Sequence, residues 1–166
     1  VTMSHLRFGD KPIKSTYLIK RANFVACHNP AYMTKFNMVQ ELVDGGTFLL
    51  NCTWSKDEVE KHIPGQVKKY MAEHNIKFYI INGVKIGIET GMGPTRINTI
   101  LQSAFFTLTG IIPKEQANKL MKDAAQKTYG RKGEDVVKKN WAAIDAGANA
   151  FRSEEHTSEL QSLRRI

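Results

Sequence analysis

Cationic and hydroxyl side chains are concentrated in the first sixteen residues of the chain. His5 and Arg7 belong to the alternating stretch VTMSHLRFG, and Lys14 and Ser15 follow the turn-like sequence GDKP. Cationic side chains on a strand and after a glycine turn suit a phosphate or carboxylate ligand, because they form charge-assisted hydrogen bonds with anionic oxygens. The alternative is an edge strand whose charges keep it from pairing with other chains.

A second candidate anion site lies in the sequence GMGPTRIN, residues 91–98. A flexible loop ends at Thr95, which we predict to be the N-cap of a helix. The backbone N–H groups and the dipole at a helix start attract anions, and Arg96 adds a positive charge. Asn98 and Gln102 are four residues apart and share a face of this helix. The alternative is that Thr95 only caps the helix, Arg96 is solvated and Asn98 forms an intramolecular hydrogen bond.

Polar residues also stand at the ends of three apolar runs. His28 and Asn29 end the first run, Asn51 lies late in the second, and Asn82 with Gly83 follows the third. Parallel strands end at one edge of a sheet, where the ligands of open α/β folds bind. These residues are therefore predicted to converge on one crevice. The alternative is that the asparagines form turns and the histidine is a capping residue.

The three apolar runs predict buried strands at residues 23–29, 46–52 and 76–82. Their nearly continuous apolar character is typical of strands covered on both faces, as in a parallel sheet. Between the first two runs, apolar residues at helical spacing predict a helix that ends at a pair of glycines.

Helical patterns also separate the second and third runs. Ser55 with Glu58 three residues later is typical of a capping box, and Pro64 with Gly65 divides this region into two helices. The order strand, helix, strand, helix, strand predicts an α/β fold: a layered, mixed or mostly parallel sheet with a βαβαβ core. The opening segment, residues 1–19, is expected to supply one or two further strands.

Helices dominate the sequence after the third strand. Apolar residues recur at helical spacing over residues 97–108, and this helix is predicted to stop at Gly110. A second helix is predicted over residues 113–129, and a third begins at about residue 134. The three together form a predicted C-terminal helical cluster.

The composition excludes several classes of protein. The chain has 166 residues, of which 42% are hydrophobic and 24% charged, as in one soluble globular domain. Cys27 and Cys52 form no C-x-x-C, so a disulfide framework, a zinc site and an iron–sulfur site are all unsupported. There is no run of about 18 apolar residues and no signal-like leader, which indicates a cytoplasmic protein. No catalytic motif and no paired carboxylates identify a catalytic residue.

The formal net charge of +8 allows two kinds of partner or none. Such a charge is typical of a protein that binds nucleic acid or an anionic small ligand, or of one with a merely basic surface. The lysines are spread along predicted helical faces and do not cluster with aromatic residues, which favours a solvated basic face. A phosphate-bearing ligand is the second interpretation, and a basic α/β module for nucleic acid is the third.

The last fifteen residues differ in character from the rest. They follow the alanine-rich stretch WAAIDAGANAF abruptly and resemble the translation of a sequencing-library adapter. We therefore predict a domain over residues 1–151 and a non-native tail over residues 152–166. The alternative is a genuine short helix, because Leu160, Leu163 and Ile166 have helical spacing.

Six stretches of the sequence resemble a single protein family. They are VTMSHLRFGDKPIKSTYLI, NFVACHNPAYM, GGTFLLNCTWS, PGQVKKYMAEHNIKFYIING, RINTILQSAFFTLTGIIP and DAAQKTYGRKGEDVVKKNWAAIDAGANA. The family is pyruvate:ferredoxin (flavodoxin) oxidoreductase, and the resemblance is to its domain III, the gamma-type domain of the 2-oxoacid:acceptor oxidoreductases. In that family a glycine-rich segment precedes the first strand and long domains flank the whole, so Val1 is expected to be a cut.

The resemblance implies an enzyme that converts pyruvate, coenzyme A and oxidised ferredoxin or flavodoxin into acetyl-CoA, carbon dioxide and the reduced carrier. The family uses thiamine diphosphate, Mg²⁺ and [4Fe–4S] clusters, all of which the resemblance assigns to other domains. This fragment alone is expected to bind none of them and to be inactive. The implied partners are the remaining domains, coenzyme A, ferredoxin or flavodoxin, and a second enzyme copy in a homodimer, without nucleic acid or membrane.

The implied role of this domain is to form a wall of the active site and to receive coenzyme A, whose diphosphate and 3′-phosphate suit a basic protein. Joined with the candidates above, it gives a set of residues predicted to face the coenzyme: His5, Arg7, Lys14, Ser15, Asn29, Arg96 and Asn98. None is predicted to be catalytic or to bind a metal. A gamma domain for another 2-oxoacid, such as 2-oxoglutarate or indolepyruvate, is an alternative.

Overall fold

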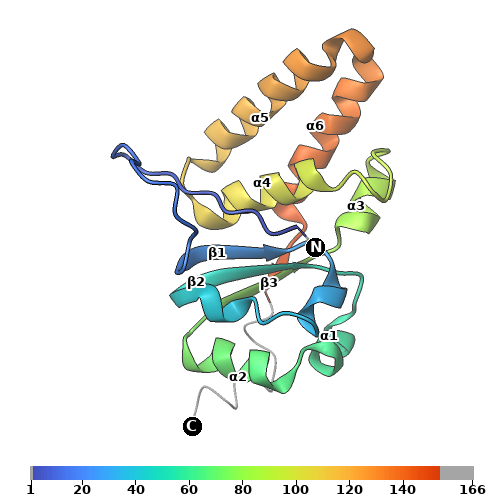
Figure 1. Cartoon of the computed structure of the whole chain (residues 1–166). Helices are drawn as coiled ribbons and strands as arrows, with labels where there is room; N and C mark the ends of the chain where they lie inside the picture. The colour runs from blue at the N-terminus through green and yellow to red at the C-terminus, as the bar shows by residue number, and fades with distance from the viewer. Residues whose placement is uncertain (1, 154–166) are drawn as a thin grey trace.

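The computed structural model describes residues 2–153, which fold around a four-stranded sheet (Figure 1). The sheet order is β1-β2-β3-β4, and the strands are β1 (Ala22–Cys27), β2 (Leu42–Asn51), β3 (Lys77–Ile81) and β4 (Arg152–Ser153). β1, β2 and β3 pair in parallel, whereas β4 pairs antiparallel to β3. The predicted α/β fold with a mostly parallel sheet is therefore confirmed.

Helices cover both faces of the sheet (Figure 1). On one side lie α1 (Lys56–His62) and α2 (Gly65–Glu73). On the other lie α3 (Gly83–Glu89), α4 (Asn98–Thr109), α5 (Lys114–Tyr129) and α6 (Glu134–Asn149), with the short 3-10 helix η3 (Gly130–Lys132) between the last two. The last three α-helices are the predicted C-terminal cluster.

The side chains of β2 alternate between two hydrophobic cores, as the pleat of a strand requires. Phe48 and Leu50 are completely buried on the side of α1 and α2. Leu49 points to the opposite side and packs with residues of α4 and α6 such as Ile100 and Ala143. The continuous apolar run in the sequence is explained by this arrangement, because both faces of the strand are covered.

Most helix ends predicted from capping residues and glycines agree with the structure. The Ser55 hydroxyl accepts a hydrogen bond from the Glu58 N–H, and the Glu58 carboxylate accepts one from the Ser55 N–H at 2.7 Å. This reciprocal pair is the predicted capping box, and it holds the pKa of Glu58 below its usual range. α4 ends at Gly110, whose φ of +61° lies in the left-handed region that glycine adopts without strain.

The prediction of a helix between the first two strands was wrong. This segment instead holds two 3-10 helices, η1 (Pro30–Met33) and η2 (Val39–Glu41), and β2 begins at Leu42. The backbone of Leu42 is already aligned with Ala22 of β1. The reason is tertiary: pairing with β1 recruits a segment whose apolar spacing alone is compatible with a helix.

Two further expectations differ from the structure, and one helix of the structure was not predicted. Residues 2–19 form no strand and bend at Asp10 and Lys11. α4 begins at Asn98, with Ile97 and not Thr95 at its N-cap position and no side-chain cap. α3 was not predicted, because the glycines in and after it obscured the helical pattern. The predicted tail lies outside the described residues except for Arg152 and Ser153, which form β4.

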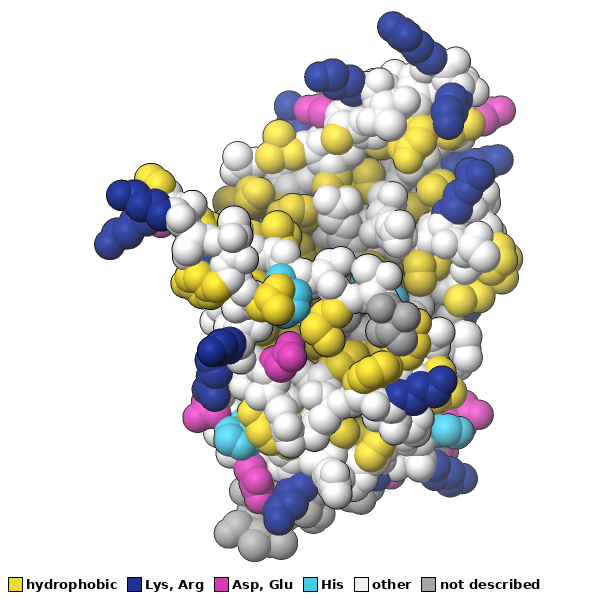
Figure 2. Space-filling model, viewed as in Figure 1, with side chains coloured by type: hydrophobic (Ala, Val, Ile, Leu, Met, Phe, Trp, Pro, Cys, Tyr) yellow, Lys and Arg dark blue, Asp and Glu magenta, His cyan; other side chains and the backbone are white. Residues whose placement is uncertain are grey.

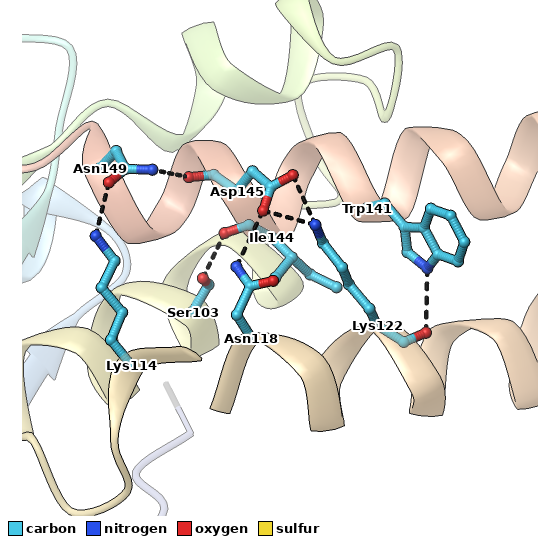
Figure 3. A network of polar contacts seen from close by, with 8 residues as sticks. All are labelled: Ser103, Lys114, Asn118, Lys122, Trp141, Ile144, Asp145 and Asn149. Carbon is cyan, nitrogen blue, oxygen red and sulfur yellow. Dashed lines mark hydrogen bonds and ion pairs between the residues drawn. The ribbon is translucent and has the colours of Figure 1, made fainter. Parts of the chain in front are cut away.

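A network of hydrogen bonds and ion pairs joins α5 to α6 (Figure 3). The Asp145 carboxylate on α6 accepts hydrogen bonds from the Asn118 amide at 3.0 Å and from the Lys122 ammonium at 2.9 Å, both on α5. The Trp141 indole donates to the backbone oxygen of Lys122 at 3.1 Å. Burial acts to raise the pKa of Asp145, but the bonds from Lys122 and Asn118 outweigh it and lower that pKa.

Candidate functional site

The carboxyl ends of the parallel strands meet at a buried asparagine. The Asn51 amide nitrogen, at the end of β2, donates to the backbone oxygen of His28 at 3.0 Å. Its side-chain oxygen accepts a hydrogen bond from the Gly83 N–H at 2.8 Å. Asn51 is only 5% exposed, and it joins the ends of all three parallel strands. The backbones of His28 and Gly83 therefore meet at one edge, as predicted, with Asn51 as a structural bridge between them. The Asn82 side-chain oxygen instead accepts a hydrogen bond from the Lys85 N–H and caps α3, as in the alternative.

The start of α4 lies directly over this bridge. A side chain at Gly83 would come within 2.9 Å of the Asn51 side-chain oxygen and 3.3 Å of the Ile97 side chain, so only glycine fits. Arg96 and Asn98 flank Ile97 and are both exposed. Two of the residues predicted to face coenzyme A are thus held at the carboxyl edge of the sheet by the packing of their neighbour.

Close backbone contact also fixes the loop that leads to α4. The Gly93 N–H donates to the Gly87 oxygen at 2.9 Å, and a Cβ at Gly87 would lie 2.3 Å from the Gly93 oxygen. Gly91 and Gly93 have φ values of +78° and +89°. Sequence reasoning missed this contact, and the glycines at 83, 87, 91 and 93 were the signal that would have indicated it.

Asn29 lies on the same edge, immediately after β1. Its side-chain oxygen accepts a hydrogen bond from the Ala31 N–H at 3.0 Å and so caps η1, while its backbone oxygen accepts one from the Cys27 thiol at 3.0 Å. Burial raises the pKa of Cys27 to about 11, and burial lowers that of His28. The thiol is therefore protonated near neutral pH.

The four candidate residues of the opening segment fall into two pairs: His5 and Arg7 form hydrogen bonds within the segment, whereas Lys14 and Ser15 are exposed. Arg7 donates to the Tyr17 backbone oxygen and its guanidinium lies 3.9 Å from the centroid of the Tyr17 ring. His5 accepts a hydrogen bond from the Ile19 N–H at 3.2 Å. Lys14 and Ser15 are exposed and lie just past the bend of the segment, whose far end stands beyond the start of β1 (Figure 1). The close contact of Ile97 with Gly83 and the bond from Asn51 to His28 therefore place Arg96, Asn98 and Asn29 next to residues of the carboxyl edge, and no such contact links Lys14 or Ser15 to it.

A cavity of about 340 Å³ lies elsewhere, between α4, α5 and α6. Its lining is mostly apolar and includes Phe106, Leu120 and Ile144, with Gln102 and Asn140 as polar members. It contains none of the residues predicted to face coenzyme A. An apolar groove of this kind does not suit phosphate groups, so the carboxyl edge is the candidate anion site.

Basic side chains do not gather on the face shown in Figure 2. Lysine and arginine side chains lie apart from one another around its periphery, which does not favour a nucleic-acid interface there. Within residues 2–153, no three His, Cys, Asp or Glu side chains are grouped as metal ligands. In the same range no helix is long and apolar enough to cross a membrane.

Comparison with solved structures supports the fold. The pyruvate oxidoreductase subunit PORC of Thermotoga maritima superposes with a TM-score of 0.60 over 81% of this chain and 66% of that subunit. The two sequences are 18% identical, so the likeness concerns the fold alone.

Comparison with known sequences identifies the family. The pyruvate:ferredoxin oxidoreductase of Moorella thermoacetica is 47% identical over 91% of this chain, and the pyruvate-flavodoxin oxidoreductase of Klebsiella pneumoniae is 47% identical over 89%. The pyruvate dehydrogenase [NADP(+)] of Cryptosporidium parvum is 49% identical over 87%. The chain spans only 13%, 12% and 7% of these three proteins. The family model of pyruvate ferredoxin/flavodoxin oxidoreductase matches residues 1–150, and the chain belongs to this family.

Proposed function

We propose that this chain forms part of an enzyme that oxidises pyruvate with coenzyme A and passes the electrons to ferredoxin or flavodoxin, and that its carboxyl edge receives the coenzyme. The products are acetyl-CoA, carbon dioxide and the reduced carrier. The names of the relatives support pyruvate over another 2-oxoacid, because each of the three contains it.

The observation that carries the coenzyme proposal is the grouping at the carboxyl edge. Arg96 is cationic and exposed, and it precedes a twelve-residue helix whose first N–H groups have no side-chain cap. Asn29 and Asn98 offer amide groups on the same edge. These are the donors that phosphate oxygens accept, and the net charge of +8 adds a general attraction for an anion.

The bridge beneath the edge gives the proposed site its rigidity. Asn51 ties the strand ends together, and Gly83 lets Ile97 approach them closely. A site whose donors are fixed before the ligand arrives spends less free energy on ordering them. In this proposal Asn51 positions the edge, and the groups that contact the phosphates are those of Arg96, Asn98 and Asn29.

His5, Arg7, Lys14 and Ser15 form a second, separate part of the proposal. His5 and Arg7 already bond within the opening segment, so their contribution to an anion site requires donors beyond those bonds. Lys14 and Ser15 stand free on the surface and are tested as a pair of their own.

The described residues do not fit the metal groups that the family uses. Cys27 and Cys52 are both buried, and no ligand cluster joins them within residues 2–153. The domain's proposed contribution is to bind and orient the coenzyme.

The test is charge reversal in the full-length oxidoreductase that contains these residues. Arg96→Glu is expected to raise the KM for coenzyme A about 10- to 100-fold, the usual cost of losing a charge-assisted hydrogen bond. Arg7→Glu and Lys14→Glu with Ser15→Ala test the second group in the same way. Lys127→Glu on α5 is the matched control, because it changes the net charge equally away from the edge. Unchanged coenzyme dependence in Arg96→Glu would exclude the carboxyl edge.

A further inference from the structure

The cavity between α4, α5 and α6 is lined by buried residues of α6 and by exposed residues of α5. Its volume is about 340 Å³. Asn140 and Ile144 of α6 are 2% and 0% exposed, whereas Leu120 of α5 is 51% exposed. We call this space the helical cavity. α5 and α6 extend away from the sheet beyond α4 (Figure 1), so its lining includes no strand residue.

Small side chains on α5 leave this volume open. Ala117, Ala124 and Ala125 lie on one face of the helix and all line the helical cavity. Protein interiors are normally packed without voids much larger than a water molecule, because atoms that face a void lose their dispersion contacts. A molecule that fills this space would restore those contacts with all three helices at once.

One buried polar atom of the lining has no partner. The Asn140 side-chain nitrogen donates to the Val136 backbone oxygen at 2.8 Å. The Asn140 side-chain oxygen is also buried, and it accepts no hydrogen bond from any described residue. An unpaired buried acceptor costs free energy comparable to a lost hydrogen bond, so nearly all such atoms in native proteins are paired. A donor group in the helical cavity would satisfy this oxygen.

The remaining lining favours a neutral aromatic ligand. Among the described residues that line the helical cavity, none is charged, so a charged ligand would lose its hydration without gaining an opposite charge. Phe106, Met121 and Tyr129 offer ring and thioether contacts, which aromatic molecules prefer. The volume is about twice that of the cavity of about 150 Å³ that holds benzene, which leaves room for roughly ten to fourteen heavy atoms.

We propose that the helical cavity is a binding site for a neutral aromatic molecule with one hydroxyl or N–H group, which donates to the Asn140 side-chain oxygen. The ring system lies against the alanines of α5 and between Phe106 and Met121. Pyruvate and the phosphates of coenzyme A are anionic and do not fit this lining, so the ligand is additional to the substrates of the proposed reaction.

Calorimetric titration of the full-length oxidoreductase with three naphthalene derivatives tests the chemistry. 2-Naphthol is neutral, carries one hydroxyl donor and is expected to bind with a Kd on the order of 100 µM. 2-Methylnaphthalene has the same size but no donor, and should bind about 10-fold more weakly. 2-Naphthoate is anionic and should not bind measurably. Equal affinities for 2-naphthol and 2-methylnaphthalene in the parent enzyme would overturn the proposal.

Three variants locate the binding. Asn140→Leu keeps the size of the side chain and removes the acceptor, so it should bind 2-naphthol and 2-methylnaphthalene equally. Ala124→Phe fills the helical cavity from an exposed position and should bind neither. Ala142→Phe is the matched control, because Ala142 is exposed on α6 and does not line the cavity. Unchanged titrations in Ala124→Phe would place the probes elsewhere and overturn the proposal.

Two further measurements separate this proposal from folding defects and from another occupant. Pyruvate oxidation by each variant reports folding, because none of the three altered residues lies at the carboxyl edge. If the 166-residue chain binds 2-naphthol but the full-length oxidoreductase does not, another part of the polypeptide fills the cavity and the proposal is wrong. Arg96 does not line the helical cavity, so the coenzyme dependence of Arg96→Glu leaves this proposal unaffected.

Discussion

Gly147 on α6 is the point where the helical cluster tolerates least change. A Cβ at this position would lie 2.3 Å from the Ile100 backbone oxygen on α4 and 3.0 Å from the Ser103 Cβ. Ser103 also crosses this seam, because its hydroxyl donates to the Ile144 oxygen at 2.5 Å. The nearest atom to the new methyl group is the Ile100 backbone oxygen, which cannot relieve the contact by a change of side-chain rotamer.

The magnitude for Gly147→Ala follows from two opposing effects. Replacing glycine by alanine within a helix stabilises it by up to about 1 kcal/mol, because alanine loses less backbone entropy. To restore an ordinary contact, α6 must move away from α4 by roughly 1 Å, and overpacking of this kind costs about 1–3 kcal/mol. The clash is with backbone, so the second effect exceeds the first. We expect Gly147→Ala to lower the free energy of unfolding by about 2 kcal/mol.

Urea unfolding of the chain, followed by far-UV circular dichroism, measures this change. Gly65→Ala at the start of α2 is the matched control, because nothing lies within 4 Å of a Cβ built there. The control should change the unfolding free energy by less than about 0.5 kcal/mol. If Gly147→Ala proves as stable as the parent chain, α4 and α6 do not pack as closely as the structure has them, and the reasoning fails.

Three other predictions concern the Asn51 bridge, the Asp145 contacts between α5 and α6, and the buried thiol of Cys27. Asn51→Leu leaves the His28 carbonyl and the buried Gly83 N–H without these partners and should destabilise the chain by about 1–3 kcal/mol in urea unfolding, whereas an unchanged midpoint would contradict the bridge. Because the folded-state pKa of Asp145 is lowered, its contribution to stability is fully present above the unfolded pKa of 3.8 and is lost as the pH falls through the folded pKa. The stability gap between the parent and Asp145→Asn should therefore be constant at neutral pH and narrow as the pH falls below 3.8. The thiol of Cys27, with its pKa of about 11, should react with Ellman's reagent only on unfolding, and rapid reaction of the folded chain at pH 8 would refute its burial.

Local chemistry was enough to predict the elements that stop and start sharply. The capping box at Ser55, the break at Pro64 and the glycine at the end of α4 each act within one helical turn, so the residues beside them carry the information. The polar residues at the strand ends were also placed correctly, because parallel strands share one edge. Asn51 could therefore be assigned to that edge before its partners were known.

Contacts between distant residues decided the rest. Whether residues 42–46 form helix or strand depends on β1, which pairs with them across some twenty residues of sequence. That Ile97 lies over Gly83, which places Arg96 at the carboxyl edge, follows from a close approach that no local pattern encodes. The path of residues 2–19, which lead away from the body and return to the start of β1, likewise follows from tertiary structure (Figure 1).

The sequence by itself thus determined the α/β alternation and the helical cluster, because periodicity, caps and breakers act over a few residues, and its similarity to known sequences identified the family. Only the tertiary structure decided which candidates lie at the carboxyl edge of the sheet and that residues 2–19 form no strand. A strand is completed by its neighbour, so its sequence can indicate the pairing but cannot supply the partner.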